Sequence, residues 1–112
     1  MVLIGTITKF DLASIRREPL ENALYEILDG NEEVLYVGAG NIRINLRQHL
    51  PDGWFPLEEA KYYRKFGGGD QNLLAERKKS LIDDYTQILG HIPKYNEKEI
   101  RPSRPLLSVE TE

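Results

Sequence analysis

The chain has 112 residues, no cysteine and a formal charge of −3. This length fits one domain that can bury its own core, and the lack of cysteine excludes disulfides and thiolate metal sites and suits a reducing, cytoplasmic environment. No apolar run approaches the roughly 20 residues of a membrane helix, and the first residues do not resemble a signal peptide, so we expect no membrane association. The acidic balance argues against a surface that binds nucleic acid everywhere, although a local basic face remains open.

The first third of the chain predicts an N-terminal arm followed by a hairpin. Residues 2–8 favour a short strand or ordered arm, and residues 10–17 favour one or two helical turns that end before Pro19. Residues 23–28 and 33–37 are two apolar runs that each contain a tyrosine, and the DGNEE between them supplies Asp-Gly turn chemistry. We therefore expect two antiparallel strands here.

The middle of the chain predicts two helices with a strand between them. Residues 41–50 favour a helix that begins at Asn41, a good N-cap residue. Residues 60–66 are rich in tyrosine and favour a third strand. Residues 71–89 repeat apolar side chains at helical spacing and end at Gly90, so they predict the longest helix.

The end of the chain predicts an extended segment and a tail. Residues 91–96 are expected to run back along the sheet, and residues 98–112 are expected to form a C-terminal tail. Residues 1–97 would then form one domain, with an arm over 1–21 and a core over 22–96. The predicted fold is α+β, with a small three-stranded antiparallel sheet flanked by helices.

Short motifs within this core occur in the order found in a known nuclease family. They are ALY in the first strand of the hairpin, YVG in the second, NIRINLRQH in the next helix, and LIDDY and PKYN further on. Together they resemble the GIY-YIG nuclease domain, which occurs in excision-repair nucleases and homing endonucleases. The resemblance implies a three-stranded antiparallel sheet flanked by helices. It also implies cleavage of phosphodiesters with one divalent metal, Mg²⁺ or Mn²⁺.

The resemblance also implies a set of site residues. Tyr25 and Tyr36 match two tyrosines that face a shared pocket, and Gly38 matches the glycine that follows the second. His49 matches a histidine at the end of the first helix, and Asn96 matches the closing asparagine. Simpler interpretations stay open, because paired tyrosines suit strands and a histidine on an apolar helix face suits a core.

The two charged positions of the family site carry other residues in this chain. An arginine would neutralise the phosphate, but Asn45 stands at its position. Arg43 and Arg47 are candidates to replace the arginine, or to contact nucleic acid, or to form a solvated face. On a helical wheel both lie toward the flank opposite Asn45, so neither reaches the same pocket without a rotated helix.

A glutamate would hold the metal in such a site, but Lys78 stands at its position. Lys78 could neutralise a phosphate there, or it could lie at the boundary of the core. Glu76 is the nearest substitute metal ligand, on a different face of the helix. The candidate catalytic residues are Tyr25, Tyr36, Arg43 and His49; the candidate nucleic-acid contacts are Arg43, Arg47, Lys78 and Asn96; the candidate metal ligand is Glu76.

Two functions follow from these substitutions. The first is a binding domain of nuclease ancestry with a degenerate catalytic site, whose partner is DNA, RNA or a protein. The second is an active metal-dependent endonuclease that uses Mg²⁺ or Mn²⁺ in an atypical site; without activity, no cofactor is expected. A nucleic-acid groove would be credible if three basic groups share one face. These groups are Arg43 with Arg47, Lys61 with Arg64 and Lys65, and Arg77 with Lys78 and Lys79.

Overall fold

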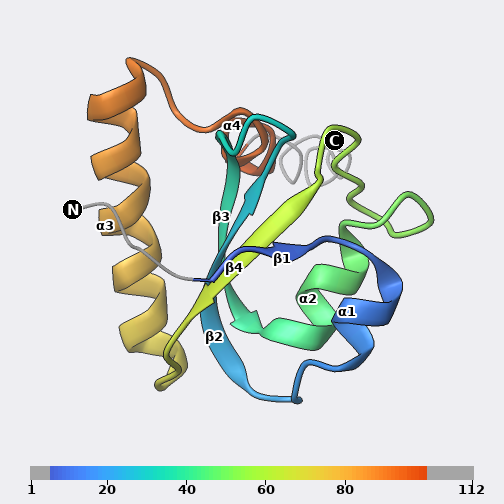
Figure 1. The fold of residues 1–112 in the computed structure, drawn as a ribbon. Helices are drawn as coiled ribbons and strands as arrows, with labels where there is room; N and C mark the ends of the chain where they lie inside the picture. The colour runs from blue at the N-terminus through green and yellow to red at the C-terminus, as the bar shows by residue number, and fades with distance from the viewer. Residues whose placement is uncertain (1–5, 101–112) are drawn as a thin grey trace, which may run out of the picture.

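The computed structural model describes residues 6–100, which form a four-stranded sheet with helices on both faces (Figure 1). The predicted α+β class is confirmed, but the predicted number of three strands is wrong. Part of the expected arm supplies a fourth strand, because its residues pair antiparallel with Tyr62 and Tyr63. The strand order is β1-β4-β2-β3, and all neighbours are antiparallel. The strands are β1 (Thr8–Lys9), β2 (Asn22–Leu28), β3 (Val34–Asn41) and β4 (Tyr62–Phe66).

Three of the four helices lie where the sequence predicts them. The fourth, α4, overturns the expectation of an extended segment over residues 91–96 and takes residues 98–100 out of the predicted tail. Pro93 precedes α4, and its restricted φ and missing N–H suit the start of a helix. Within residues 6–100, no helix combines the length and apolar character needed to cross a membrane. The helices are α1 (Leu12–Arg16), α2 (Ile42–Gln48), α3 (Gln71–Leu89) and α4 (Lys94–Ile100).

The ends of α2 and α3 follow from local capping. The side chain of Asn41 accepts a hydrogen bond from the Ile44 N–H, and that of Asp70 accepts one from the Leu73 N–H. In each helix, one side-chain oxygen of the capping residue thus binds a backbone N–H that has no partner within the first turn. At the other end of α3, Gly90 takes a φ of 83°, a left-handed conformation that glycine adopts without a steric penalty.

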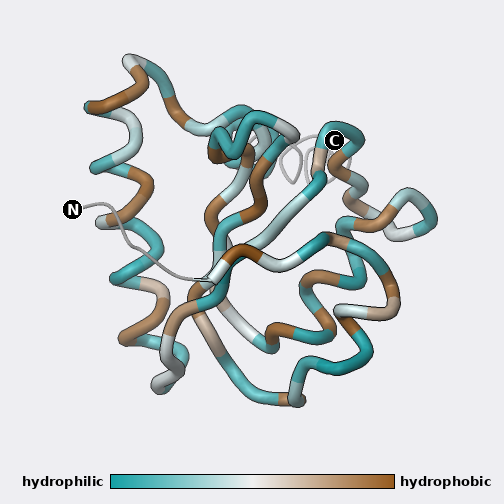
Figure 2. Tube along the Cα trace, viewed as in Figure 1, coloured by the Kyte–Doolittle hydropathy of each residue, from teal (hydrophilic) through white to brown (hydrophobic). Residues whose placement is uncertain are grey.

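The sheet separates two apolar layers, with α3 on one face and α1 and α2 on the other (Figure 1). Successive residues of a strand point to opposite faces, so Leu24 packs with α3 while Tyr25 packs on the side of α2. Hydrophobic and hydrophilic positions alternate along α3 (Figure 2), as expected for a helix that covers a sheet with one face. The side of α2 therefore receives the two hairpin tyrosines.

The layer under α3 contains a buried ion pair. Glu26 of β2 is 0% exposed. Its carboxylate accepts hydrogen bonds from Arg64 Nε at 3.0 Å and from the Tyr85 hydroxyl at 2.5 Å. Burial raises the pKa of Glu26, while the hydrogen bond from Tyr85 and the charge of Arg64 oppose the rise. The guanidinium of Arg64 is thus paired with a buried carboxylate, although its side chain is partly exposed.

Helix α4 covers the free edge of β3 through one side chain. Asn96 is 1% exposed. Its Oδ1 accepts from the Val37 N–H at 2.8 Å, and its Nδ2 donates to the Val37 carbonyl at 2.9 Å. A carboxamide that pairs with both backbone groups of a residue replaces a neighbouring strand at that point. This contact fixes α4 and places its last turn beside the sheet.

Candidate functional site

A cavity of about 580 Å³ opens beside β3, between α2, α3 and α4. Among the predicted site residues, it gathers Tyr25, Tyr36, His49 and Lys78. Arg43, Arg47, Glu76 and Asn96 do not line it. The full lining is Tyr25, Tyr36, Ala39, Asn45, Gln48, His49, Trp54, Phe55, Lys78 and Glu99.

Tyr25 reaches the cavity wall across β3 because Gly38 has no side chain. The two residues are direct partners in the register of β2 and β3. A Cβ at Gly38 would lie 2.3 Å from Cζ of the Tyr25 ring. The ring itself is 1% exposed, so it has little room to move aside.

We expect Gly38→Ala to lower the free energy of unfolding by about 1–3 kcal/mol, the usual cost of overpacking. The displaced Tyr25 ring should also lose the hydrogen bond between its hydroxyl and His49 Nε2, which are 3.3 Å apart. Urea unfolding measures the first effect, and the NMR signals of the ring measure the second. Gly67→Ala is the matched control, since a Cβ there meets nothing within 4 Å. Equal stability of the two variants would contradict this account of Gly38.

His49 joins the cavity wall to the loop after α2. Its Nδ1 lies 2.9 Å from the Phe55 carbonyl, which can only accept a hydrogen bond, so Nδ1 carries the proton. Burial lowers the pKa of His49 and favours the neutral ring. The Nε2 atom is then an acceptor for the Tyr25 hydroxyl at 3.3 Å. Burial also raises the pKa of Tyr25, so both groups are neutral near pH 7.

The charged part of the cavity is an ion pair between Lys78 and Glu99. Lys78 Nζ lies 3.0 Å from Glu99 Oε1 and 5.4 Å from the centre of the Tyr36 ring. The Tyr36 hydroxyl donates to Glu99 Oε2 at 2.6 Å. Burial, followed by the neighbouring Tyr25 and Glu99, raises the pKa of Tyr36. The cavity therefore contains one cation and one anion that neutralise each other.

Glu99 is the site residue that the sequence reasoning missed. Glu99 falls in the tail predicted over residues 98–112, a segment for which the sequence patterns indicate no catalytic or binding residue. A helical reading of KYNEKEI would have placed Glu99 three residues after Asn96, on the same helix face. Pro93 ahead of this segment was the available signal.

Aromatic rings form the rim of the cavity. Tyr36 and His49 have ring centres 4.8 Å apart, and His49 and Phe55 have centres 5.3 Å apart. Trp54 stacks on Phe55 at an interplanar angle of 29°, yet remains 78% exposed. Phe55 thus anchors the loop, while Trp54 presents a flat apolar surface at the mouth of the cavity.

The donors of this cavity do not fit a divalent metal. Mg²⁺ and Mn²⁺ prefer several oxygen ligands, with at least one free carboxylate. Among the described residues that line the cavity, Glu99 is the one carboxylate, and it is already paired with the Lys78 ammonium. Glu76 is exposed on α3, away from the cavity. Over residues 6–100, no group of three or more His, Asp or Glu side chains could hold a metal ion.

The three basic groups do not share one face. Arg43 donates to the backbone carbonyl of Arg16 at 2.7 Å, and Arg47 pairs with Asp52 at 2.7 Å. Both lie on α2, whereas α3 covers the opposite face of the sheet (Figure 1), and of its basic group only Lys78 is among the residues that line the cavity beside β3. With the partly exposed Arg64 paired to the buried Glu26 carboxylate, the arrangement offers no continuous basic groove across these groups.

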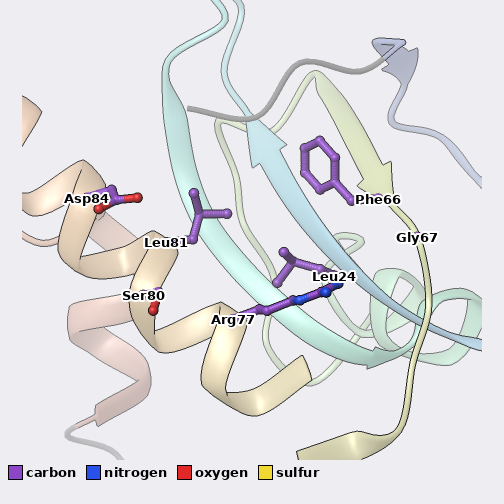
Figure 3. A pocket seen from close by; sticks show the side chains of 7 residues that line it. All are labelled: Leu24, Phe66, Gly67, Arg77, Ser80, Leu81 and Asp84. Atoms are coloured by element: carbon purple, nitrogen blue, oxygen red, sulfur yellow. The ribbon is translucent and has the colours of Figure 1, made fainter. Parts of the chain in front are cut away.

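A second hollow, of about 290 Å³, lies between α3 and the strands β2 and β4 (Figure 3). Leu24, Phe66 and Leu81 form its apolar wall, and Arg77 extends across it from α3. It contains none of the predicted site residues. We therefore take the cavity beside β3 as the candidate site.

The two tyrosines, the histidine and Lys78 line one cavity, although they come from β2, β3, the end of α2 and α3. Such convergence of polar groups in a sizeable, mostly apolar hollow is typical of a ligand site. No family model matches the chain, and no similar curated protein or solved structure was found.

Proposed function

We propose that this chain is a non-catalytic binding domain with a GIY-YIG-like arrangement, and that its cavity holds one nucleotide unit of a DNA or RNA strand. The observation that carries the proposal is the Lys78 ammonium inside the cavity, at the position where the resemblance implies a metal-binding carboxylate. A lysine there provides a positive charge for a phosphate group without any metal.

The aromatic rim supports a ligand that also has a flat ring. Exposed tryptophan surfaces stack well on nucleobases, whatever their sequence. Trp54 and Phe55 stand at the mouth, and Lys78 lies deeper, over the Tyr36 ring. A cavity of about 580 Å³ falls within the range of small-molecule sites. A nucleotide unit could stack its base on the aromatic rim and place its phosphate near the Lys78 ammonium, so it would use both the apolar and the charged part of the cavity.

The distribution of charge favours a single nucleotide unit over a long duplex. Tight duplex binding needs several free cations along the backbone. Arg47 and Arg64 are paired with carboxylates, and the chain as a whole has a charge of −3. A flexible single strand can instead place one base and one phosphate in the cavity.

Short single-stranded DNA and RNA oligonucleotides test this function in the presence of EDTA. We expect them to quench the fluorescence of Trp54, the only tryptophan of the chain. Lys78→Ala should weaken the binding by about tenfold or more, because it removes the cation and leaves Glu99 facing the phosphate. Lys79→Ala, an exposed neighbour on α3, should change it by less than about threefold. No binding of either nucleic acid would contradict the proposal.

An active endonuclease is the second candidate. The observation in its favour is the hydrogen bond between the Tyr25 hydroxyl and His49 Nε2, since a neutral imidazole can accept a phenolic proton. The same oligonucleotides decide between the two functions. Cleavage that requires added Mg²⁺ or Mn²⁺, and that is lost in Tyr25→Phe, would replace the binding domain by the enzyme.

A further inference from the structure

Three hydrogen-bond donors in the cavity converge on one carboxylate of the chain itself. Lys78 Nζ lies 3.0 and 3.2 Å from the two oxygens of Glu99, and the Tyr36 hydroxyl lies 2.6 Å from Oε2. Asn96 Nδ2 stands 3.5 Å from Oε1. The donors come from α3, β3 and α4. This arrangement surrounds an oxyanion with one cation and two neutral donors.

We propose that Glu99 occupies an anion site that is built for the phosphate group of a ligand, and that it competes with that ligand. An ammonium and a hydroxyl aimed at one oxyanion are the groups that proteins use for phosphate. The inference deepens the proposed function and rests on it for the identity of the ligand. It adds that the site is closed by the chain's own carboxylate.

Glu99 is the movable member of this group. Lys78 lies well inside the 19-residue helix α3, and Tyr36 lies inside a paired strand, so the backbone of both residues is held in place. Glu99 lies one residue before the end of the seven-residue helix α4, and its side chain is 37% exposed. Partly exposed ion pairs are weak, so rotation of one side chain can open the site. The hydrogen bonds of Asn96 would hold α4 in place meanwhile.

The competition sets the apparent affinity of the site. A ligand binds only the fraction of molecules in which Glu99 has left, so its apparent dissociation constant is raised by the inverse of that fraction. Removal of the carboxylate opens the site permanently. It also removes the negative charge that neutralises Lys78 at 3.0 Å while the site is closed.

Inorganic phosphate, titrated into the isotope-labelled full chain and followed by NMR, tests the site without any nucleotide. We expect Glu99→Gln to bind phosphate about tenfold more tightly than the wild type, with shifts centred on Tyr36 and Lys78. Glu99→Ala should behave in the same way. This second variant is needed because the glutamine side chain in Glu99→Gln could stay where the carboxylate was and still block the site. Glu76→Gln, an exposed site on α3, makes the same change of charge and should bind like the wild type. Lys78→Gln combined with Glu99→Gln should abolish the gain.

Equal phosphate affinities for the wild type, Glu99→Gln and Glu99→Ala would overturn the inference, and so would a gain of equal size in Glu76→Gln. Parallel titrations with a single-stranded oligonucleotide separate this failure from that of the proposed function. If phosphate binding rises but no oligonucleotide binds, the anion site stands and the proposed function fails. If oligonucleotides bind while the phosphate affinities are equal, the proposed function stands and the inference fails.

Discussion

Arg64→Met will lower the free energy of unfolding by about 3 kcal/mol or more at neutral pH, because it leaves a buried carboxylate without its cation. Arg64 Nη2 lies 2.8 Å from Glu26 Oε1, and the Glu26 side chain is fully buried. The Tyr85 hydroxyl stays as a partner but carries no charge. Methionine keeps most of the volume of the arginine stem, so the loss reports the missing charge. Urea unfolding at neutral pH measures it.

Lys65→Met is the matched control for this variant. Lys65 is the next residue of β4 and pairs with Glu18, but its side chain is 44% exposed. Since exposed ion pairs contribute little, we expect a change of less than about 1 kcal/mol. Equal losses in the two variants would mean that burial does not distinguish the two ion pairs.

The effect of Arg64→Met will also depend on pH. Burial raises the pKa of Glu26, and Arg64 holds the rise down, so the variant should have a still higher pKa at this carboxyl. A carboxyl with a raised pKa binds more protons in the folded protein than in the unfolded chain. Stability therefore falls as the pH rises from about 4.3, the value for an unperturbed glutamate, through the raised value.

The difference between variant and wild type should thus be smaller near pH 5 than near pH 8. Unfolding curves at the two pH values measure it. Glu26→Gln combined with Arg64→Met removes the titrating group and should remove this dependence. A loss of stability that stays constant with pH would show that the carboxylate is not its cause.

Asn96→Ala will lower the free energy of unfolding by about 2–4 kcal/mol. The reason is that both backbone groups of Val37 lose their partner while they remain in a buried environment. The edge of β3 should open locally, and the Val37 amide should exchange with solvent much faster than other amides of the strand. Hydrogen exchange followed by NMR resolves this single amide.

The same variant should loosen α4 and, with it, Glu99. The matched control is Asn72→Ala, which makes the same chemical change at an exposed position of α3 and should alter stability by less than about 0.5 kcal/mol. If the Val37 amide remains protected in Asn96→Ala, a contact other than this carboxamide holds the edge of β3.

Much of the local structure of this protein follows from patterns of neighbouring residues. Two apolar runs on either side of an Asp-Gly turn predict the hairpin of β2 and β3, and helical periodicity that ends at Gly90 predicts α3. These features depend on residues close together in the chain, so a single sequence contains the information. Tyr25, Tyr36 and His49 lie close together for the same reason, because the register of one hairpin and the helix that follows it bring their rings within contact distance.

The rest of the site and the edges of the sheet depend on contacts between segments that are far apart in the chain. Glu99 and Tyr36 are 63 residues apart, and Asn96 and Val37 are 59 apart. Nor does a local pattern show that β1 pairs with β4, or that Arg43 binds the Arg16 carbonyl and Arg47 pairs with Asp52. Packing between distant segments selects such partners. Hydrophobic periodicity and capping residues carry no information about these contacts, because they depend only on residues close together in the chain.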